Sequence, residues 1–493
     1  MKHSIKFGLI GGMILFCLSM SLTSCEDILG EWSRPTPNPV TPGGGGSSTI
    51  AVTGVKLNEA YLRFDKNVLT AQTLTATVAP DDATDKTVTW ESSDESVATV
   101  DENGQVTPKT KGTVTITATA HDGSGIKATS TVIVYDKIVD ISSGAVTVTA
   151  NEEWLINGNG TATAVTNGIT IGDGATVTLK GINISKQIAC AGTATIILAD
   201  GSTNTVDASG IDYNAAIKVG GAGKTLTIDA ETEGTGTLTA KGGSNAAGIG
   251  TSRNETGGNI VINGGRVTAT GGLEGAGIGT GLAEVLTKFG DITINGGTVT
   301  ATGGGSAAGI GTGRANNGSN TCGAITIIDG TVTAEGGDSG AGIGTGDAVS
   351  NTNTCGAITI NGGTVTAKGG YSGAGIGTGN DNGWTNKCDD IKINGGTVIA
   401  TGGEKAAGIG TGAANNETNE CGAITIGTGV TSVTATKGTG TGSFNSIGTG
   451  KNSSGTQKCG TITIGGVEYW DGAAYQNGGN TYLTGDIIYT PAP

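Results

Sequence analysis

Five cysteines recur at a nearly constant spacing in the second half of the chain: Cys322, Cys355, Cys388, Cys421 and Cys459. If each interval is one turn of a stacked structure, neighbouring cysteines lie about 4.8 Å apart, inside the range of about 4.4–6.8 Å between Cα atoms in disulfides. Five is an odd number, so vertical disulfides and a column of reduced thiols both remain open. The chain has two histidines and no Cys-x-x-Cys pair, so we expect no metal site.

Two aromatic residues stand out among the repeats, because aromatic residues make up only 4% of the chain. Tyr371 and Trp384 occupy positions where neighbouring repeats carry acidic or amide residues, and Asp389 and Asp390 follow shortly afterwards. An aromatic ring in a polar loop can stack on a sugar ring, whereas packing within its own loop is the ordinary alternative. We take Tyr371, Trp384, Asp389 and Asp390 as candidate ligand-binding residues.

The distribution of acids and bases argues against catalysis. His121 is the one histidine beyond the first few residues, which disfavours a histidine base. A glycosidase needs two carboxyl groups about 5–9.5 Å apart, but Asp291 and Asp390 lie three repeats apart, or roughly 14 Å in a stack. We therefore predict no catalytic residue, no cofactor and no enzyme activity. The formal charge of −15 also excludes nucleic acid as a partner, because phosphate binding needs clustered Lys and Arg.

The element Gly-Ile-Gly returns through the second half of the chain, with its isoleucine at Ile249, Ile278, Ile310, Ile343, Ile376, Ile409 and Ile447. A typical unit, residues 355–379, contains three strand-length pieces: Ala-Ile-Thr-Ile, Thr-Val-Thr-Ala and Ala-Gly-Ile-Gly. One unit cannot bury its Ile face alone, whereas stacked units can. The pattern predicts an all-β fold with a parallel, right-handed β-helix over residues 137–470, three strands per turn, and repeats of about 33 residues from roughly residue 240.

Stacking also predicts which polar and aromatic residues have structural roles. Side-chain amides at Asn263, Asn295, Asn361 and Asn394 should form a ladder along the axis, in which Asp329 substitutes once. Glu335 should pair with Lys368 one turn later. Residues 471–493 are expected to form a C-terminal cap or tail. We assign Tyr469, Trp470, Tyr475 and Tyr482 to covering that end of the helix and Trp154 to covering the other.

Residues 49–136 alternate in short strands at intervals of roughly ten residues, which is typical of a β-sandwich. The stretches Val52–Leu57, Thr87–Ser93, Ser96–Val100, Asn103–Val106 and Gly112–Ala118 resemble the bacterial Ig-like group 2 domain. The resemblance implies a spacer or adhesion module without catalysis, with Trp90 in its core.

The N-terminus has the pattern of an export signal. Lys2, His3 and Lys6 precede an apolar run from Phe7 to Leu22, which predicts a signal peptide over residues 1–24. The run ends in Leu-Thr-Ser-Cys25, which resembles a bacterial lipobox and implies lipidation of Cys25. Residues 25–48 are rich in Pro and Gly and read as a flexible tether. Glu26 and Asp27 resemble a sorting signal for the outer surface, so we expect an exported protein, anchored to the outer membrane and facing the exterior.

The Gly-Ala-Gly-Ile-Gly units are similar to repeats of bacterial surface β-helix proteins, some of which bind carbohydrate and follow Ig-like group 2 domains. This resemblance covers about residues 140–470 and supplies no site residues. It implies a non-catalytic surface lipoprotein that adheres to, or binds, glycans or host or matrix components, touching the membrane only through its N-terminal lipid. A purely structural display protein and a polysaccharide lyase or hydrolase are the alternatives.

Overall fold

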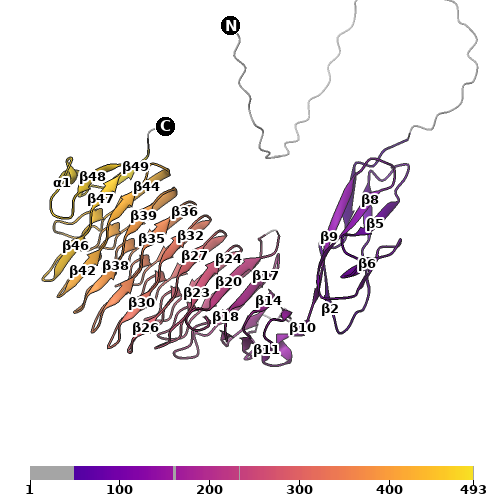
Figure 1. Cartoon of the computed structure of the whole chain (residues 1–493), viewed down its shortest axis with the longest axis horizontal. Helices are drawn as coiled ribbons and strands as arrows, with labels where there is room; N and C mark the ends of the chain where they lie inside the picture. The colour runs from indigo at the N-terminus through magenta and orange to yellow at the C-terminus, as the bar shows by residue number, and fades with distance from the viewer. Residues whose placement is uncertain (1–48, 159–162, 233, 492–493) are drawn as a thin grey trace, which may run out of the picture. The chain divides into compact units, whose positions relative to one another are not determined.

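The computed structural model describes residues 49–158, 163–232 and 234–491, and all structural statements refer to these. The expected signal peptide, Cys25 and the tether lie outside the described residues. Beyond Ala51 the chain is almost entirely β-structure, with a β-sandwich followed by a parallel β-solenoid of about eight turns (Figure 1). Among the described residues, no helix has the length and apolar character to span a bilayer.

The β-sandwich is built from nine short strands that enclose one main core. In β8, Val114, Ile116 and Ala118 are buried while the threonines between them face outward, which is the period-two pattern of a half-buried strand. Trp90 packs against this core, as expected. The sheets have the orders β2-β9-β8-β5, β3-β7-β6 and β1-β4. The strands are β1 (Gly54–Leu57), β2 (Tyr61–Asp65), β3 (Gln72–Thr73), β4 (Ala76–Ala79), β5 (Val88–Ser92), β6 (Ala98–Val100), β7 (Gln105–Pro108), β8 (Gly112–Ala120) and β9 (Lys127–Tyr135).

Three long parallel sheets run the length of the solenoid, and we name them after their repeating residues. The Ile-Thr-Ile sheet contains β10 (Lys137–Asp140), β12 (Glu153–Asn157), β14 (Ala175–Lys180), β17 (Ala194–Leu198), β20 (Thr225–Ala230), β23 (Asn259–Ile262), β27 (Ile292–Ile294), β31 (Ile325–Ile327), β35 (Ile358–Ile360), β39 (Ile391–Ile393), β43 (Ile424–Ile426), β47 (Ile462–Ile464) and β48 (Val467–Trp470). The Thr-Val-Thr sheet contains β15 (Asn183–Ile184), β18 (Thr203–Asp207), β21 (Thr237–Lys241), β24 (Arg266–Thr270), β28 (Thr298–Thr302), β32 (Thr331–Glu335), β36 (Thr364–Lys368), β40 (Gly396–Thr401), β44 (Val430–Thr436) and β49 (Ile487–Tyr489). The Ile-Gly sheet contains β11 (Val146–Val148), β13 (Ile169–Ile171), β16 (Ile188–Cys190), β19 (Ile217–Lys218), β22 (Ile249–Gly250), β25 (Ile278–Gly279), β29 (Ile310–Gly311), β33 (Ile343–Gly344), β37 (Ile376–Gly377), β41 (Ile409–Gly410) and β45 (Ile447–Gly448).

Each coil places its isoleucines directly over those of the coil before. Ile325 pairs in register with Ile358, for example, and Ile343 with Ile376, and these side chains have no exposed surface. The core is therefore a set of vertical columns of branched aliphatic side chains, as the repeat predicts. Surface side chains 33 positions apart also lie one above the other. Asn394 donates to Asn361 at 2.9 Å, and Lys368 lies 2.7 Å from Glu335.

The expectation of three strands per turn is wrong for the later coils, which have a fourth. This Cys sheet contains β26 (Thr287–Lys288), β30 (Asn320–Cys322), β34 (Asn353–Cys355), β38 (Asn386–Cys388), β42 (Thr418–Cys421) and β46 (Thr456–Cys459). Its sequence is polar and gives little strand signal. The strand forms because a buried amide holds it: Asn353 donates to the carbonyl oxygen of Gly313 at 2.9 Å, and Asn386 to that of Gly346 at 2.8 Å. A buried side chain that satisfies backbone carbonyls in this way fixes the chain where it lies.

The last residues fold back over the end of the solenoid. Strand β48 pairs antiparallel with β47, β49 pairs antiparallel with β44, and α1 (Gly479–Tyr482) lies between them in the chain. Tyr469 and Tyr482 stack at 4.6 Å between ring centroids and pack on the core, so these two residues cover the end as expected. The Ile-Gly and Cys sheets receive no such strand and end at β45 and β46. At the other end, η1 (Ile141–Ser143) follows β10, and Trp154 is buried in the second strand of the Ile-Thr-Ile sheet.

Candidate functional site

The five recurring cysteines occupy the same register position in successive strands of the Cys sheet. Cys322 pairs in register with Cys355, Cys355 with Cys388, Cys388 with Cys421, and Cys421 with Cys459. All five are thiols in this structure. The first four are buried, whereas Cys459 is partly exposed. The neighbouring Cys355 thiol and burial together raise the pKa of Cys322 well above its usual range, so that thiol is unreactive.

Tyr371 lies in the turn between β36 and β37, where its ring is 48% exposed. Its partners come from the next coil: the Lys405 ammonium lies 5.0 Å from the ring centroid, and the hydroxyl donates to Glu404 at 3.4 Å. The ring is thus already engaged by a cation on one side. A sugar that stacked on this ring would compete with Lys405 for the aromatic surface.

Trp384 and the two aspartates lie in other turns of the same coil. Trp384 precedes β38 and is 49% exposed, whereas Asp389 and Asp390 lie between β38 and β39. Asp390 accepts a hydrogen bond from the backbone of Ala423 at 3.0 Å and lies 3.3 Å from Lys392, so it ties its turn to the next coil. The four candidate residues therefore occupy three successive corners of one coil, and no contact between described residues joins Tyr371 to Trp384 or to either aspartate.

A cleft at the C-terminal end of the solenoid brings together residues that the sequence had not grouped. Its volume is about 540 Å³, which is in the range of small-molecule sites. It lies between the loop after β48 and the last coil, where the Ile-Gly and Cys sheets end without a covering strand. It is lined by Glu420, Cys421, Gly422, Asn445, Gly448, Thr449, Gln457, Lys458, Cys459, Gly460, Ile462, Trp470, Gly472 and Tyr475.

Two aromatic rings form one wall of this C-terminal cleft. Trp470 and Tyr475 meet edge to face, with centroids 5.0 Å apart and ring planes at 63°. The Trp470 indole donates to the carbonyl oxygen of Cys459 at 3.2 Å, which fixes its orientation, and Tyr475 is 42% exposed. The other walls carry the exposed Lys458 and the half-buried Gln457. Apolar rings beside a few polar groups are the usual composition of a sugar site. Trp470 also packs on the core, as expected of a residue that covers the end, and together with Tyr475 it lines the cleft.

A second group that was not identified from the sequence surrounds Asp347, whose side chain is 5% exposed. Burial raises the pKa of Asp347 to about 7, although Arg314 and an amide of Asn380 oppose the shift. Arg314 is also bonded to Glu274. In the next coil Asp381 accepts backbone hydrogen bonds from Gly383 at 2.9 Å and Glu417 at 2.7 Å. The acceptors of this group are occupied by the protein itself, so we assign it a structural role despite the perturbed pKa.

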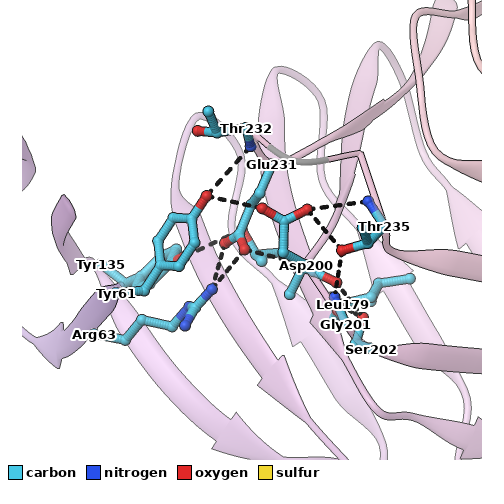
Figure 2. A network of polar contacts seen from close by, with 12 residues as sticks. Tyr61, Arg63, Tyr135, Leu179, Asp200, Gly201, Ser202, Glu231, Thr232 and Thr235 are labelled. Carbon is cyan, nitrogen blue, oxygen red and sulfur yellow. Dashed lines mark hydrogen bonds and ion pairs between the residues drawn. The ribbon is translucent and has the colours of Figure 1, made fainter. Parts of the chain in front are cut away.

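A polar network joins the β-sandwich to the solenoid (Figure 2). One guanidinium nitrogen of Arg63 donates to both carboxylate oxygens of Glu231 at 2.7 and 2.6 Å, and the Tyr61 hydroxyl donates to Asp200 at 2.9 Å. Glu231 also accepts from the backbone of Asp200 at 2.8 Å. The Arg63 and Glu231 side chains are only 13% and 6% exposed, so the pair is largely shielded from water. Both carboxylate oxygens of Glu231 are bonded within the protein, whereas the buried Nε of Arg63 has no hydrogen-bond partner among the described residues.

Replacing Arg63 with methionine should leave the Glu231 carboxylate buried without its cation. Removing one partner of a buried pair costs about 3–5 kcal/mol, and here the cost should appear as local opening of β2. We expect faster hydrogen exchange of the β2 backbone amides. The double variant Arg63→Met/Glu231→Gln removes the orphaned charge and should recover most of the protection; unchanged exchange in the single variant would contradict the assignment.

Comparison with known proteins agrees with both parts of this fold. A model of the bacterial Ig-like domain (group 2) matches residues 51–132. A model of the beta helix repeat matches residues 260–282, 292–314, 325–347, 358–380 and 391–413. The chain combines a bacterial Ig-like domain with a β-helix repeat region. Each of the five matched repeats begins in the Ile-Thr-Ile sheet and ends just after the Gly-Ile-Gly element. The strands of the Cys sheet lie outside the matches, four of them between successive matches and β42 and β46 after the last.

Several relatives of this Ig-like and β-helix protein carry names of carbohydrate-active enzymes. The chain is 42% identical over 104 residues to lacto-N-biosidase of Bifidobacterium bifidum, which is 21% of this chain and 9% of that protein. It is 53% identical over 79 residues to an alpha-L-arabinofuranosidase of Bifidobacterium longum, covering 16% and 7%. It is 41% identical over 99 residues to kappa-carrageenase of Pseudoalteromonas carrageenovora, covering 19% and 24%. The matches are partial, since the chain spans no more than about a quarter of the length of these three relatives.

Among the described residues, no group of three or more His, Cys, Asp or Glu side chains is placed to hold a metal ion. The C-terminal cleft combines an aromatic wall, an exposed lysine and a pair of thiols, and we take it as the candidate site.

Proposed function

We propose that this protein is a non-catalytic surface protein that binds a glycan, and that the glycan lies in the C-terminal cleft. The observation that carries the proposal is the aromatic wall of Trp470 and Tyr475 beside a cleft of about 540 Å³. A pyranose ring offers an apolar face to an aromatic ring and hydroxyl groups to the polar residues around it. Lys458 and Glu420 extend from neighbouring strands at the rim and can bind those hydroxyls.

The names of the partially matching relatives support a carbohydrate ligand, but they do not support a reaction for this chain. Their names concern polysaccharides and oligosaccharides, but the similarity covers small parts of each protein in Ig-like regions. A segment that occurs in enzymes with different substrates is better explained as an accessory module than as a catalytic domain. The Ig-like domain then acts as a spacer that carries the β-helix.

The C-terminal cleft is preferred over the four residues first chosen from the sequence. Tyr371 is engaged by Lys405, and Trp384 and the two aspartates lie at other corners of the coil. In contrast, Trp470 and Tyr475 share one wall, and the indole is held by a hydrogen bond to the last coil.

Replacing Tyr475 with alanine should weaken glycan binding about tenfold, which corresponds to about 1.4 kcal/mol. Tyr475 is exposed, so its loss should not disturb the core. Binding can be measured by affinity electrophoresis of the full chain in gels that contain neutral or acidic polysaccharides. Tyr371→Ala is the matched control, because that residue is also a tyrosine and is similarly exposed.

Three outcomes would contradict different parts of the proposal. If Tyr371→Ala weakens binding and Tyr475→Ala does not, the site is in the middle of the solenoid instead. If the wild-type chain is retarded by none of the polysaccharides, glycan binding itself is wrong and the structural display role is favoured. Release of reducing ends or of unsaturated uronides from the same substrates would establish a hydrolase or lyase.

The proposal includes attachment to the outer membrane, facing the exterior, through a lipid on Cys25. It rests on the sequence pattern at the N-terminus, which lies outside the described residues. Anchoring there would hold the β-helix at a distance set by the Pro- and Gly-rich tether and the Ig-like domain.

A further inference from the structure

The two cysteines that line the C-terminal cleft differ from the other members of their column. The sulfur atoms of Cys421 and Cys459 are 3.0 Å apart. Their residues pair in register on β42 and β46, so their Cα atoms have the spacing of neighbouring strands, about 4.8 Å, which is within the range of disulfides. A movement of about 1 Å would bring the sulfur atoms to bonding distance.

Access and mobility favour this pair over the others. Cys322, Cys355 and Cys388 are buried, and β34 and β38 are paired on both sides, which holds Cys355 and Cys388 in place. Cys459 is partly exposed, opens into the cleft and belongs to the last strand of the Cys sheet. An edge strand has no neighbour on one side to resist a small shift. An oxidant can therefore reach Cys459 through the cleft without any opening of the solenoid.

We propose that Cys421 and Cys459 form a redox-active pair that closes into a disulfide, while the other three cysteines of the column stay reduced. The oxidant is a low-molecular-weight disulfide. The Cys459 thiolate attacks one of its sulfur atoms, which releases one thiol and leaves a mixed disulfide on Cys459. Cys421 then loses its proton and attacks the Cys459 sulfur, which releases the second thiol. The protein loses two electrons and two protons, and the oxidant gains them.

The second step should be slower than the first. The hydrogen bond with Cys459 and burial raise the pKa of Cys421 well above its usual range, so its thiolate is scarce. The closed disulfide would link the last coil to the one before it across 38 residues of chain, counted from Cys421 to Cys459. Such a link restrains the end of the solenoid, which is where a stack of repeats frays first. This inference is independent of what the cleft binds.

Peptide mapping can identify the disulfide without ambiguity, because trypsin separates the relevant cysteines. Cleavage after Lys405, Lys437 and Lys458 leaves Cys421 and Cys459 on different peptides, and Cys388 begins a third after Lys387. Cys322 and Cys355 share one peptide. The full chain is incubated with excess oxidised glutathione, its free thiols are alkylated after unfolding, and the digest is analysed by mass spectrometry.

We expect the peptides of Cys421 and Cys459 to be joined, with a glutathione adduct on Cys459 at early times, and Cys322, Cys355 and Cys388 to be alkylated. Oxidation should raise the melting temperature by about 2–5 °C. Cys459→Ser should abolish the joined peptides and the rise in melting temperature, whereas Cys322→Ser, at the other end of the column, should leave both unchanged. Joining of Cys388 to Cys421, a two-dalton loss within the Cys322 and Cys355 peptide, or a lasting glutathione adduct without joined peptides would overturn the proposal.

Discussion

Replacing Gly377 with alanine is expected to lower the free energy of unfolding by more than about 3 kcal/mol. Gly377 has a φ of +133°, and a Cβ on its backbone would lie 1.8 Å from the carbonyl oxygen of Gly410 in the next coil. That oxygen belongs to β41, which is itself paired to the following coil. Neither strand can move aside without breaking its ladder of hydrogen bonds, so the two coils should separate at this point.

The effect can be measured by urea unfolding followed by far-ultraviolet circular dichroism. Gly305→Ala is a matched control two coils earlier, because a Cβ there would meet Leu273 at 3.6 Å, an ordinary contact. We expect the control to change stability by less than about 0.5 kcal/mol. Equal destabilisation by both variants would mean that the glycines act through chain flexibility rather than through close approach of the coils.

Replacing Asp347 with asparagine is expected to stabilise the protein at pH 8 and to change little at pH 5. The native pKa of Asp347 is raised to about 7 by burial, whereas an unfolded aspartate has a pKa of about 3.9. Between these values the native state holds a proton that the unfolded state has lost, so the free energy of unfolding falls as the pH rises from about 4 to about 7. Above pH 7 both states are ionised, and the full penalty of about 4 kcal/mol is reached.

Asparagine suits this site because the next coil carries Asn380 at the equivalent position. The substitution forfeits the attraction between Asp347 and Arg314, which lies 3.9 Å away, so we expect a net gain of about 1–3 kcal/mol at pH 8. The measurement is the melting temperature of wild type and variant from pH 5 to pH 8. Asp338→Asn, an exposed position in the same coil, should show no such pH dependence. A variant that is less stable than wild type at pH 8 would show that the ion pair outweighs the cost of burial.

The part of the fold that could be predicted follows from a constant period. When residues 33 positions apart lie one above the other, a single alignment of the repeat gives the Ile columns, the Asn ladder, the Glu335–Lys368 pair and the order of the cysteines. No long-range information is needed, because each coil contacts chiefly its two neighbours. The Ig-like domain was recognisable from alternation and from its resemblance to a known family.

The repeated strand of the Cys sheet and strand β2 were not predicted from the sequence. The Cys sheet is polar, and it forms because buried amides such as that of Asn353 bind backbone carbonyls of the preceding coil. Strand β2 pairs in parallel with β9, far along the chain, and its Tyr61 and Arg63 bind acidic residues of the solenoid. In both cases the partners are distant in sequence, so no local pattern shows where the strand pairs. Only β2 carries a local strand signal, because the buried Leu62 and Phe64 alternate with more exposed residues.

The sequence by itself determined the solenoid, its columns and the alignment of the five cysteines, because stacking converts a repeat directly into contacts. It did not determine where a ligand could lie, and it pointed instead to Tyr371 and Trp384, which the structure places at separate corners. Only the tertiary structure decided that the last 25 or so residues fold back over two of the four sheets and leave the other two open. That incomplete covering creates the C-terminal cleft, orients Trp470 and Tyr475 along one wall, and exposes Cys459 beside Cys421. No repeat encodes it, because it exists only where the repeat ends.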